Sequence, residues 1–212
     1  LQRSRFDAAA RPDVAPTAPS SLYEHAFITP YHYAHPVRGA SKAATAAKPV
    51  ATDPRATLAE LDRRLGLLED RAMVEKVQRV YGYYLATLLW DELAALFAED
   101  GTIEIAMRGI YVGRPAVRRN LNLYGQAGLD DGVLHNHMQF QPVIHVSPDG
   151  KTAHLRSRAL SMMGNYGRGG QWMGGVYENV FEKVDGVWKF KHDRVMNSYF
   201  APYETGWKDL AQ

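Results

Sequence analysis

Residues 90–104 have the sequence WDELAALFAEDGTIE and mark a change from helix to strand within this 212-residue chain. A short helical pattern over 90–98 stops at Asp100-Gly101. Apolar and polar residues then alternate over 102–107, as they do in a half-buried strand. A turn at Arg108-Gly109 and a partner strand at 110–112 are expected to follow.

The pattern upstream of this stretch is helical and the pattern downstream is mostly β. Thr57 and Glu60 have capping-box spacing and predict a helix over 58–68, with a second helix from Asp70 to Leu88. Pro115 predicts the first turn of a further helix that runs to Tyr124. Strands are predicted after that helix at 137–146, 152–163, 172–184 and 187–196. Helices followed by an antiparallel meander predict an α+β fold with the sheet folded over the helices.

The chain divides into an extended arm and one domain. Residues 1–57 hold 7 of the 11 prolines and lack helical periodicity, so we predict an N-terminal arm that is not an independent domain. Residues 58–212 are predicted to form a single domain. The aromatic segment 23–35 is expected to pack on the body or on a neighbouring subunit, and the alternative is a poorly ordered tail.

Composition excludes several classes of function. Lys and Arg total 25 against 23 Asp and Glu, a net charge of +2 that is too balanced for nucleic-acid or anionic-membrane binding. With no cysteine, thiolate catalysis and cysteine-ligated metals are excluded. No apolar run approaches the roughly 18–20 residues of a membrane span. The first residue is Leu1, which is explained either by removal of an export signal or by a missing upstream stretch, so the compartment stays open.

Several segments carry a resemblance to a known family. They are residues 90–104, 111–118 (YVGRPAVR), 142–144, 149–153 and 177–190. Together these segments resemble the SnoaL-like branch of the nuclear transport factor 2-like superfamily, over roughly residues 60–205. The resemblance implies a cone-shaped α+β barrel, in which a curved, mostly antiparallel sheet wraps a long helix around a deep apolar pocket. It also implies a homo-oligomer, either a dimer or a trimer.

The resemblance also implies catalytic residues. Tyr81 matches the catalytic tyrosine of ketosteroid isomerase and of bile-acid 7α-dehydratase, a phenol that donates to an oxyanion or assists a leaving hydroxyl. Tyr84 lies one turn further on. His137 stands five residues before Pro142, as the catalytic histidine does in the dehydratases, and an imidazole exchanges protons readily near neutral pH. The alternative for all three residues is a structural role in the core.

Three positions depart from the family pattern. Ala86 replaces the helix aspartate of the dehydratases, Ile105 replaces the general base of the isomerase, and Asn197 replaces an arginine. A charged catalytic group must therefore come from elsewhere. We expect Ile105, Asn197 and Tyr199 to contact the substrate.

Further site residues follow from strand alternation. Trp188, Phe190, His192 and Arg194 share one face of the last predicted strand by period two, so Arg194 is a catalytic candidate and His192 a substrate contact. His135 lies on the same face as His137.

The remaining expectations concern a glycine-rich hairpin, two arginines and the possibility of a metal. Trp172 belongs to a glycine-rich hairpin over 164–175 and is expected to face an aromatic ligand. Arg156 and Arg158 are expected on the opposite, convex face of the sheet. No His, Asp and Glu cluster has metal-ligand spacing, so neither a metal nor another cofactor is expected.

Residues 134–139 (LHNHMQ) and 199–207 (YFAPYETGW) look like the sphingomonad branch that includes a diarylpropane lyase. This implies a bacterial, cofactor-independent lyase of lignin breakdown and aromatic compound catabolism, with a small aromatic substrate. Such a substrate loses water to give a quinone methide and then releases formaldehyde to leave a stilbene. The rival hypothesis is a non-catalytic binding module for a hydrophobic aromatic metabolite, favoured by Ala86 and Ile105. A related dehydratase, cyclase or isomerase is the remaining alternative.

Overall fold

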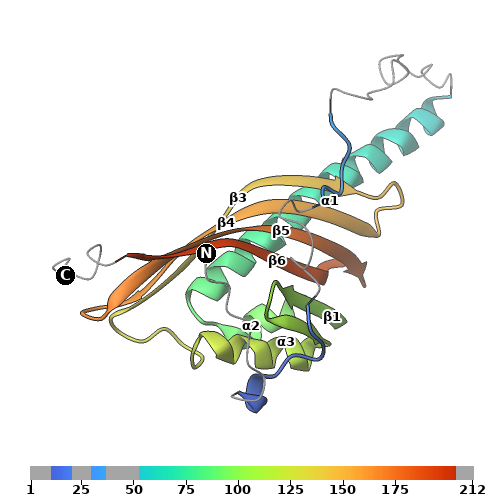
Figure 1. The fold of residues 1–212 in the computed structure, drawn as a ribbon. Coiled ribbons are helices and arrows are strands. Elements are labelled where there is room, and N and C mark those ends of the chain that lie inside the picture. The colour runs from blue at the N-terminus through green and yellow to red at the C-terminus, as the bar shows by residue number, and fades with distance from the viewer. Residues whose placement is uncertain (1–10, 21–29, 37–52, 204–212) are drawn as a thin grey trace.

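The structure is a computed structural model that describes residues 11–20, 30–36 and 53–203 (Figure 1). Its helices are η1 (Pro12–Val14), α1 (Pro54–Ala86), α2 (Trp90–Ala95), α3 (Arg114–Leu121) and η3 (Asn122–Tyr124). Its strands are β1 (Phe97–Ile105), β2 (Gly109–Val112), β3 (Val133–Val146), β4 (Thr152–Asn165), β5 (Gly169–Val184) and β6 (Val187–Tyr203).

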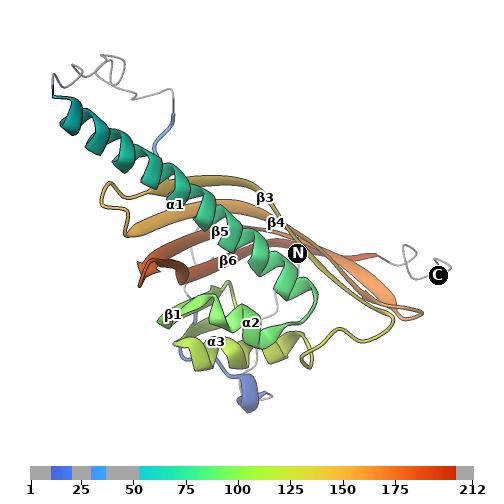
Figure 2. The ribbon, with the colours of Figure 1, turned by 180° about the vertical axis from the view of Figure 1, so that it is seen from behind.

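The strands form one curved six-stranded sheet in the order β2-β1-β6-β5-β4-β3. Only the contact between β1 and β6 is parallel, and every other pair of neighbours is antiparallel. Helix α1 crosses the concave face, with α2 and α3 beside its C-terminal half (Figure 2). The predicted α+β cone is therefore confirmed.

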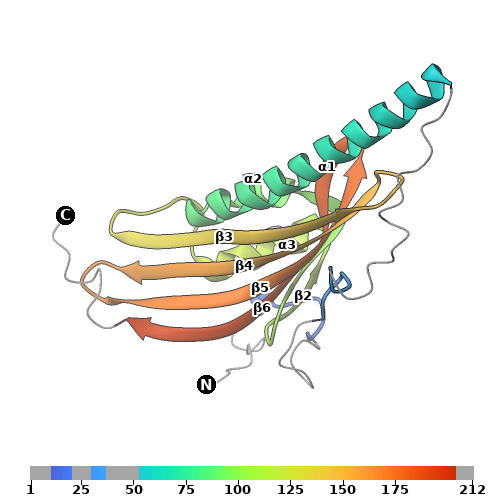
Figure 3. The same ribbon diagram turned by 90° about the horizontal axis from the view of Figure 1, so that it is seen from above.

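Helix α1 is one continuous helix of 33 residues and not the two helices expected over 58–88. It begins before Thr57, because the carboxylate of Asp53 accepts a hydrogen bond from the Arg55 backbone N–H at 2.9 Å and Pro54 occupies the first turn. Its N-terminal half extends beyond the sheet (Figure 3). In the described residues, no helix is both long and apolar enough to cross a membrane.

Close packing places the helix directly against strand β3. A Cβ atom added to Gly82 would lie 2.8 Å from the carbonyl oxygen of His137, so only glycine lets α1 approach this near. On β4, the inward residues include Ala153, Ser157 and Ala159, all buried, whose small side chains leave room for the helix. The strand segment with both histidines is therefore held against the C-terminal half of α1.

Strand β6 contains two β-bulges that change which side chains face inward. Phe190 pairs with Phe181 but His192 pairs with Val180, so Lys191 is an extra residue. The second extra residue is Ser198, further along the strand. Each bulge shifts the inward–outward alternation by one position.

The first bulge overturns the predicted alternation in β6. Trp188 and Phe190 are buried on the inner face, and after the bulge Asp193 and Val195 are buried there instead of His192 and Arg194. The expectation that Trp188, Phe190, His192 and Arg194 share one face is therefore wrong.

The described parts of the arm pack on the body. The hydroxyl of Tyr111 donates to the carbonyl of Val14 at 2.9 Å. Residues 30–36 lie on the convex face of the sheet, where the backbone N–H of His32 donates to Glu178 at 3.1 Å and Arg156 donates to the carbonyl of Pro30 at 3.0 Å. The aromatic residues of 23–29 lie outside the described ranges.

Candidate active site

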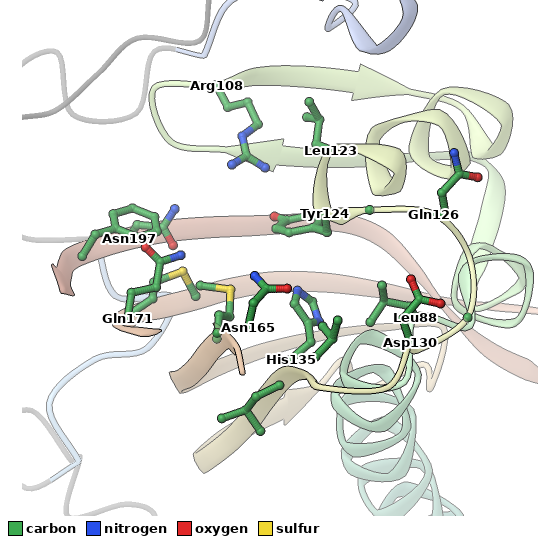
Figure 4. Close-up of a pocket in the computed structure, with 18 residues that line it drawn as sticks. Leu88, Arg108, Leu123, Tyr124, Gln126, Asp130, His135, Asn165, Gln171 and Asn197 are labelled. Atoms are coloured by element: carbon green, nitrogen blue, oxygen red, sulfur yellow. The ribbon is translucent and has the colours of Figure 1, made fainter. Parts of the chain in front are cut away.

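A cavity of about 440 Å³ lies at the wide end of the cone, between the β1–β2 hairpin, η3 and the ends of β3 to β6 (Figure 4). Its apolar lining includes Leu88, Leu123, Met163, Met173 and Phe200. Its polar lining includes Arg108, Tyr124, His135, Asn165, Gln171 and Asn197. The mixture suits an apolar ligand with a few polar substituents.

His135 presents a basic nitrogen at this cavity. Its Nδ1 lies 2.9 Å from the carbonyl oxygen of Leu85, at the end of α1. Because a carbonyl oxygen can only accept, Nδ1 carries the proton and Nε2 keeps its lone pair. Nε2 is buried and has no hydrogen-bond partner among the described residues. Burial also lowers the pKa of His135, so the imidazole is neutral at neutral pH.

His137 lies behind His135, with the two ring centroids 4.5 Å apart. Its Nδ1 is 2.8 Å from the hydroxyl oxygen of Ser161, and its Nε2 has no partner in the described part of the chain. Burial, together with the smaller effect of the adjacent His135, lowers the pKa of His137 to about 3. His137 does not line the cavity, so a ligand would meet His135 first.

A buried carboxyl group lies deeper in the cone. Asp193 is fully buried, and neither of its carboxyl oxygens has a hydrogen bond of normal geometry within the described ranges. Burial raises the pKa of Asp193 to about 7, although the Tyr81 hydroxyl and the Asn179 amide lower it. Burial, with the nearby Asp193, raises the pKa of Tyr81 well above its usual value. Asp193 therefore exchanges a proton close to neutral pH, while the Tyr81 hydroxyl stays protonated.

Two residues of the cavity wall were not singled out in the sequence. The Tyr124 ring lies 5.7 Å from that of His135 and 6.3 Å from that of His137, measured between centroids. The guanidinium of Arg108 lies 5.1 Å from the Tyr124 ring centroid. Tyr124 and Arg108 occupy a helix end and a tight turn, and no local pattern distinguishes such positions from ordinary surface.

The structure brings only some of the expected site residues together. His135 and Asn197 line the cavity. Tyr81 is buried beside Tyr177, with their rings edge to face at 5.9 Å. Tyr84 is half-buried against the core, and Ile105 is buried within it, so neither lines the cavity.

Two expected substrate contacts lie on the convex face instead. Gln171 and Met173 line the cavity, so the alternation of β5 points Trp172 the other way, where its ring meets Tyr203 at 5.9 Å. Tyr199 follows the second bulge of β6 and covers Gly174 on the same outer side. The expectation that both aromatic rings face the ligand is wrong.

The two cationic candidates of β6 also point outward. His192 shares a hydrogen bond of 2.9 Å with the Thr102 hydroxyl, and Arg194 forms an ion pair with Glu104 at 3.3 Å. Both positions follow the first bulge, which period two cannot predict. No group of three or more His, Asp or Glu in the described ranges is arranged to hold a metal ion.

The chain belongs to the family of SnoaL-like domains, whose model matches residues 67–194. A search of curated proteins found no match.

Solved structures with the same fold support this assignment. A provisionally assigned scytalone dehydratase from Novosphingobium aromaticivorans is 27% identical with a TM-score of 0.56, over 68% of this chain and 93% of its own. A hexachlorocyclohexane dehydrochlorinase of LinA type 3 from Novosphingobium barchaimii is 20% identical with a TM-score of 0.56, over 66% and 94%. A third structure, LinA, is 20% identical with a TM-score of 0.58, and the match covers 66% of this chain and 94% of LinA.

Proposed function

We propose that the protein is a cofactor-independent lyase that uses acid–base chemistry on an aromatic substrate. The observation that carries the proposal is the neutral His135, which lines a cavity of mixed polar and apolar side chains and whose buried Nε2 has no hydrogen-bond partner among the described residues. The names of two similar structures, a dehydratase and a dehydrochlorinase, denote loss of water and of HCl, which are also eliminations.

Each polar group has a distinct role in the proposal. Neutral His135 accepts a proton from the substrate, and His137 supports the resulting imidazolium from behind. The Tyr124 hydroxyl is the phenol that faces the cavity and donates to the departing oxygen. Tyr81 and Asp193, deeper in the cone, supply the proton reserve in place of the aspartate absent at Ala86.

The specific reaction is dehydration and deformylation of a lignin-derived diarylpropane diol. The para-phenol loses its proton and the benzylic hydroxyl leaves as water, which gives a quinone methide. Loss of the proton from the terminal hydroxyl then breaks the adjacent carbon–carbon bond and releases formaldehyde. The electron pair restores the aromatic ring, and the product is a stilbene. No oxidant is needed, because the atoms of the diol equal those of the stilbene, water and formaldehyde together.

The test is incubation with a panel of phenolic diarylpropane diols, followed by stilbene absorbance and trapped formaldehyde. His135→Gln is expected to lower kcat about 10²–10⁴-fold, the usual range for loss of a general base. His137→Gln is expected to lower it less, because His137 does not line the cavity. His145→Gln, on the convex face, serves as the matched control. Turnover unchanged in His135→Gln would refute the assigned base, and an unconverted panel would refute the specific reaction.

A carrier of hydrophobic aromatic metabolites is the second candidate function. It is favoured by Ala86 and by the hydrogen bonds of both histidines, which go to a carbonyl and a hydroxyl and not to a carboxylate. Tight binding of every panel member without any product would support the carrier and exclude the diarylpropane lyase reaction.

A further inference from the structure

Arg108 places a positive charge at the cavity wall, where its guanidinium lies 5.1 Å from the centroid of the Tyr124 ring. The residue lies in the turn between β1 and β2, and its side chain points into the cavity (Figure 4). Its Nη1 atom is buried without a hydrogen-bond partner, and Arg108 forms no ion pair within the described part of the chain. A buried guanidinium N–H without an acceptor is costly, so a ligand that supplies one gains affinity.

The remaining polar groups give the cavity two different ends. The amide side chains of Gln171 and Asn197 lie toward one end, Asn165 lies near the middle beside His135, and Asp130 lies near the other end, beside Leu88 (Figure 4). An anionic substituent near Asp130 would be repelled. The same substituent near Arg108 would be neutralised, with amide N–H donors within the same lining.

We propose that Arg108 is the specificity residue for a carboxylate on the aromatic substrate, so that the natural substrate is a diarylpropane diol that also carries a carboxylate on one of its rings. The identification of this cavity as the substrate site rests on the proposed function. A carboxylate matches the fork of a guanidinium with two parallel hydrogen bonds. A phenol is neutral at pH 7 and cannot compensate the charge, which leaves the carboxylate as the better partner.

Binding measurements test the carboxylate site without any need for turnover. The probes are 2-naphthoate and 2-naphthamide, which have the same ring and nearly the same shape but differ in charge, with 2-naphthol as a phenol arm. Titration calorimetry at pH 7 is expected to show at least tenfold tighter binding of the carboxylate, about what one charge-assisted hydrogen bond supplies. Arg108→Gln is expected to remove this preference, and Arg108→Lys to keep part of it. Arg55→Gln, an equal loss of charge at an exposed position of α1, is the control.

Each outcome decides the proposal. A carboxylate preference lost in Arg108→Gln but kept in Arg55→Gln supports the proposal. Equal binding of acid and amide, tighter binding of the phenol, failure of all three probes to bind, or a preference that survives in Arg108→Gln overturns it. A selective binder without lyase activity would refute the proposed function and leave the carboxylate site intact.

An independent observation concerns the part of α1 that extends beyond the sheet. Four leucines there, Leu58, Leu61, Leu65 and Leu68, are each more than half exposed. Their spacing of three, four and three residues is that of the a and d positions of two heptads. They lie roughly 150° around the helix from the buried face of its C-terminal half, so they point away from the chain's own body.

We infer that this leucine stripe pairs with the same stripe of a second copy in a short parallel coiled coil. Arg64 occupies position g of the first heptad and Glu69 position e of the second, which are the positions that face each other across a parallel pair. An antiparallel pair would instead place Glu69 opposite acidic Asp62. The two bodies then lie on opposite sides of the helix pair.

The molar mass of the protein in solution tests whether this interface forms. Leu61→Glu/Leu65→Glu is expected to halve the mass measured by light scattering without loss of helical circular dichroism, because both side chains are exposed. Leu129→Glu/Val187→Glu adds the same charge at two exposed apolar positions elsewhere and should leave the mass unchanged. Arg64→Glu should weaken association and Arg64→Glu/Glu69→Arg should restore it. A monomeric wild type, or a mass kept by the first variant, overturns the inference.

Discussion

Asp193 is a buried carboxyl group beside Tyr81 that sequence analysis did not identify. A carboxylate was expected to be missing, because Ala86 and Ile105 occupy the two habitual acidic positions. The structure buries Asp193 beside Tyr81 because Lys191 is bulged. The inward placement of single residues was therefore predicted where it depends on regular alternation, as at His135 and His137, and missed where one extra residue shifts it.

Replacing Asp193 by Asn is expected to change how stability depends on pH. The folded-state pKa of about 7 exceeds the unfolded value near 3.9, so the folded state holds an extra proton between these values. Wild-type unfolding free energy should fall as pH rises through this window, by a few kcal/mol in all. Asp193→Asn should therefore be more stable than wild type at pH 8, with the gain shrinking at pH 4. Urea unfolding measures this, and an equal difference at both pH values would contradict it, with exposed Asp185→Asn as control.

His137 is expected to have the opposite effect. Its folded-state pKa of about 3 lies below the unfolded value near 6.5, so the unfolded chain binds the extra proton as pH falls. Its contribution is present above pH 6.5 and is lost below it, at about 1.4 kcal/mol per pH unit. His137→Gln should flatten the acid loss between pH 6 and 4, as measured by urea unfolding. The same acid loss in His137→Gln and wild type would show that the imidazole is protonated in the folded protein.

At the scale of elements, the strands and the helix-to-sheet order could be predicted, but the packing contacts that place them could not. The continuous α1 replaced two expected helices because no strong helix breaker separates Leu68 from Asp70. The exposed leucines of α1 are spaced as in an amphipathic helix but do not face the core. Their periodicity therefore predicted a helix without showing which side of it is buried. The register changes in β6 could not be predicted without knowing how β6 pairs with β5.

Gly82 and Gly66 provide a matched test of helix packing within α1. Alanine normally stabilises a helix relative to glycine by about 0.5–1 kcal/mol. Gly66→Ala should show this gain, because a Cβ atom there meets nothing within 4 Å. Gly82→Ala should instead destabilise by about 1–3 kcal/mol, since its Cβ atom would press on the carbonyl of His137. Thermal unfolding measures both, and a stabilised Gly82→Ala would show that α1 and β3 separate freely.

For the whole molecule, the cone and the arm were both expected, while the attachment of the arm depends on contacts between distant residues. Glu178 on β5 accepts hydrogen bonds from His32 and from Arg156, and Arg156 also lies over the ring of Tyr31, 3.9 Å from its centroid. These contacts cover part of the convex face with residues 30–36. No local pattern in the sequence identifies such a contact across 146 positions.

Glu178→Gln is expected to loosen this part of the arm. The substitution removes the charge that Arg156 and His32 share, which leaves a half-buried guanidinium with a weaker partner. Hydrogen exchange of residues 30–36 should speed up by about tenfold or more, while that of β4 and β5 stays the same. Glu182→Gln, on the same strand but paired with Lys191, is the control. Unchanged exchange in Glu178→Gln would show that other contacts hold the segment.

The bulge at Lys191 has an evolutionary consequence. If Lys191 instead took a regular place in the ladder, strict alternation would turn His192 and Arg194 into the interior and Asp193 to the outer face. An acidic interior would become a basic one without any substitution at those three positions. In a strand of this kind, the gain or loss of one bulge exchanges whole sets of side chains, so lineages that share this cone could diverge in chemistry through shifts of strand register that point-mutation comparisons overlook.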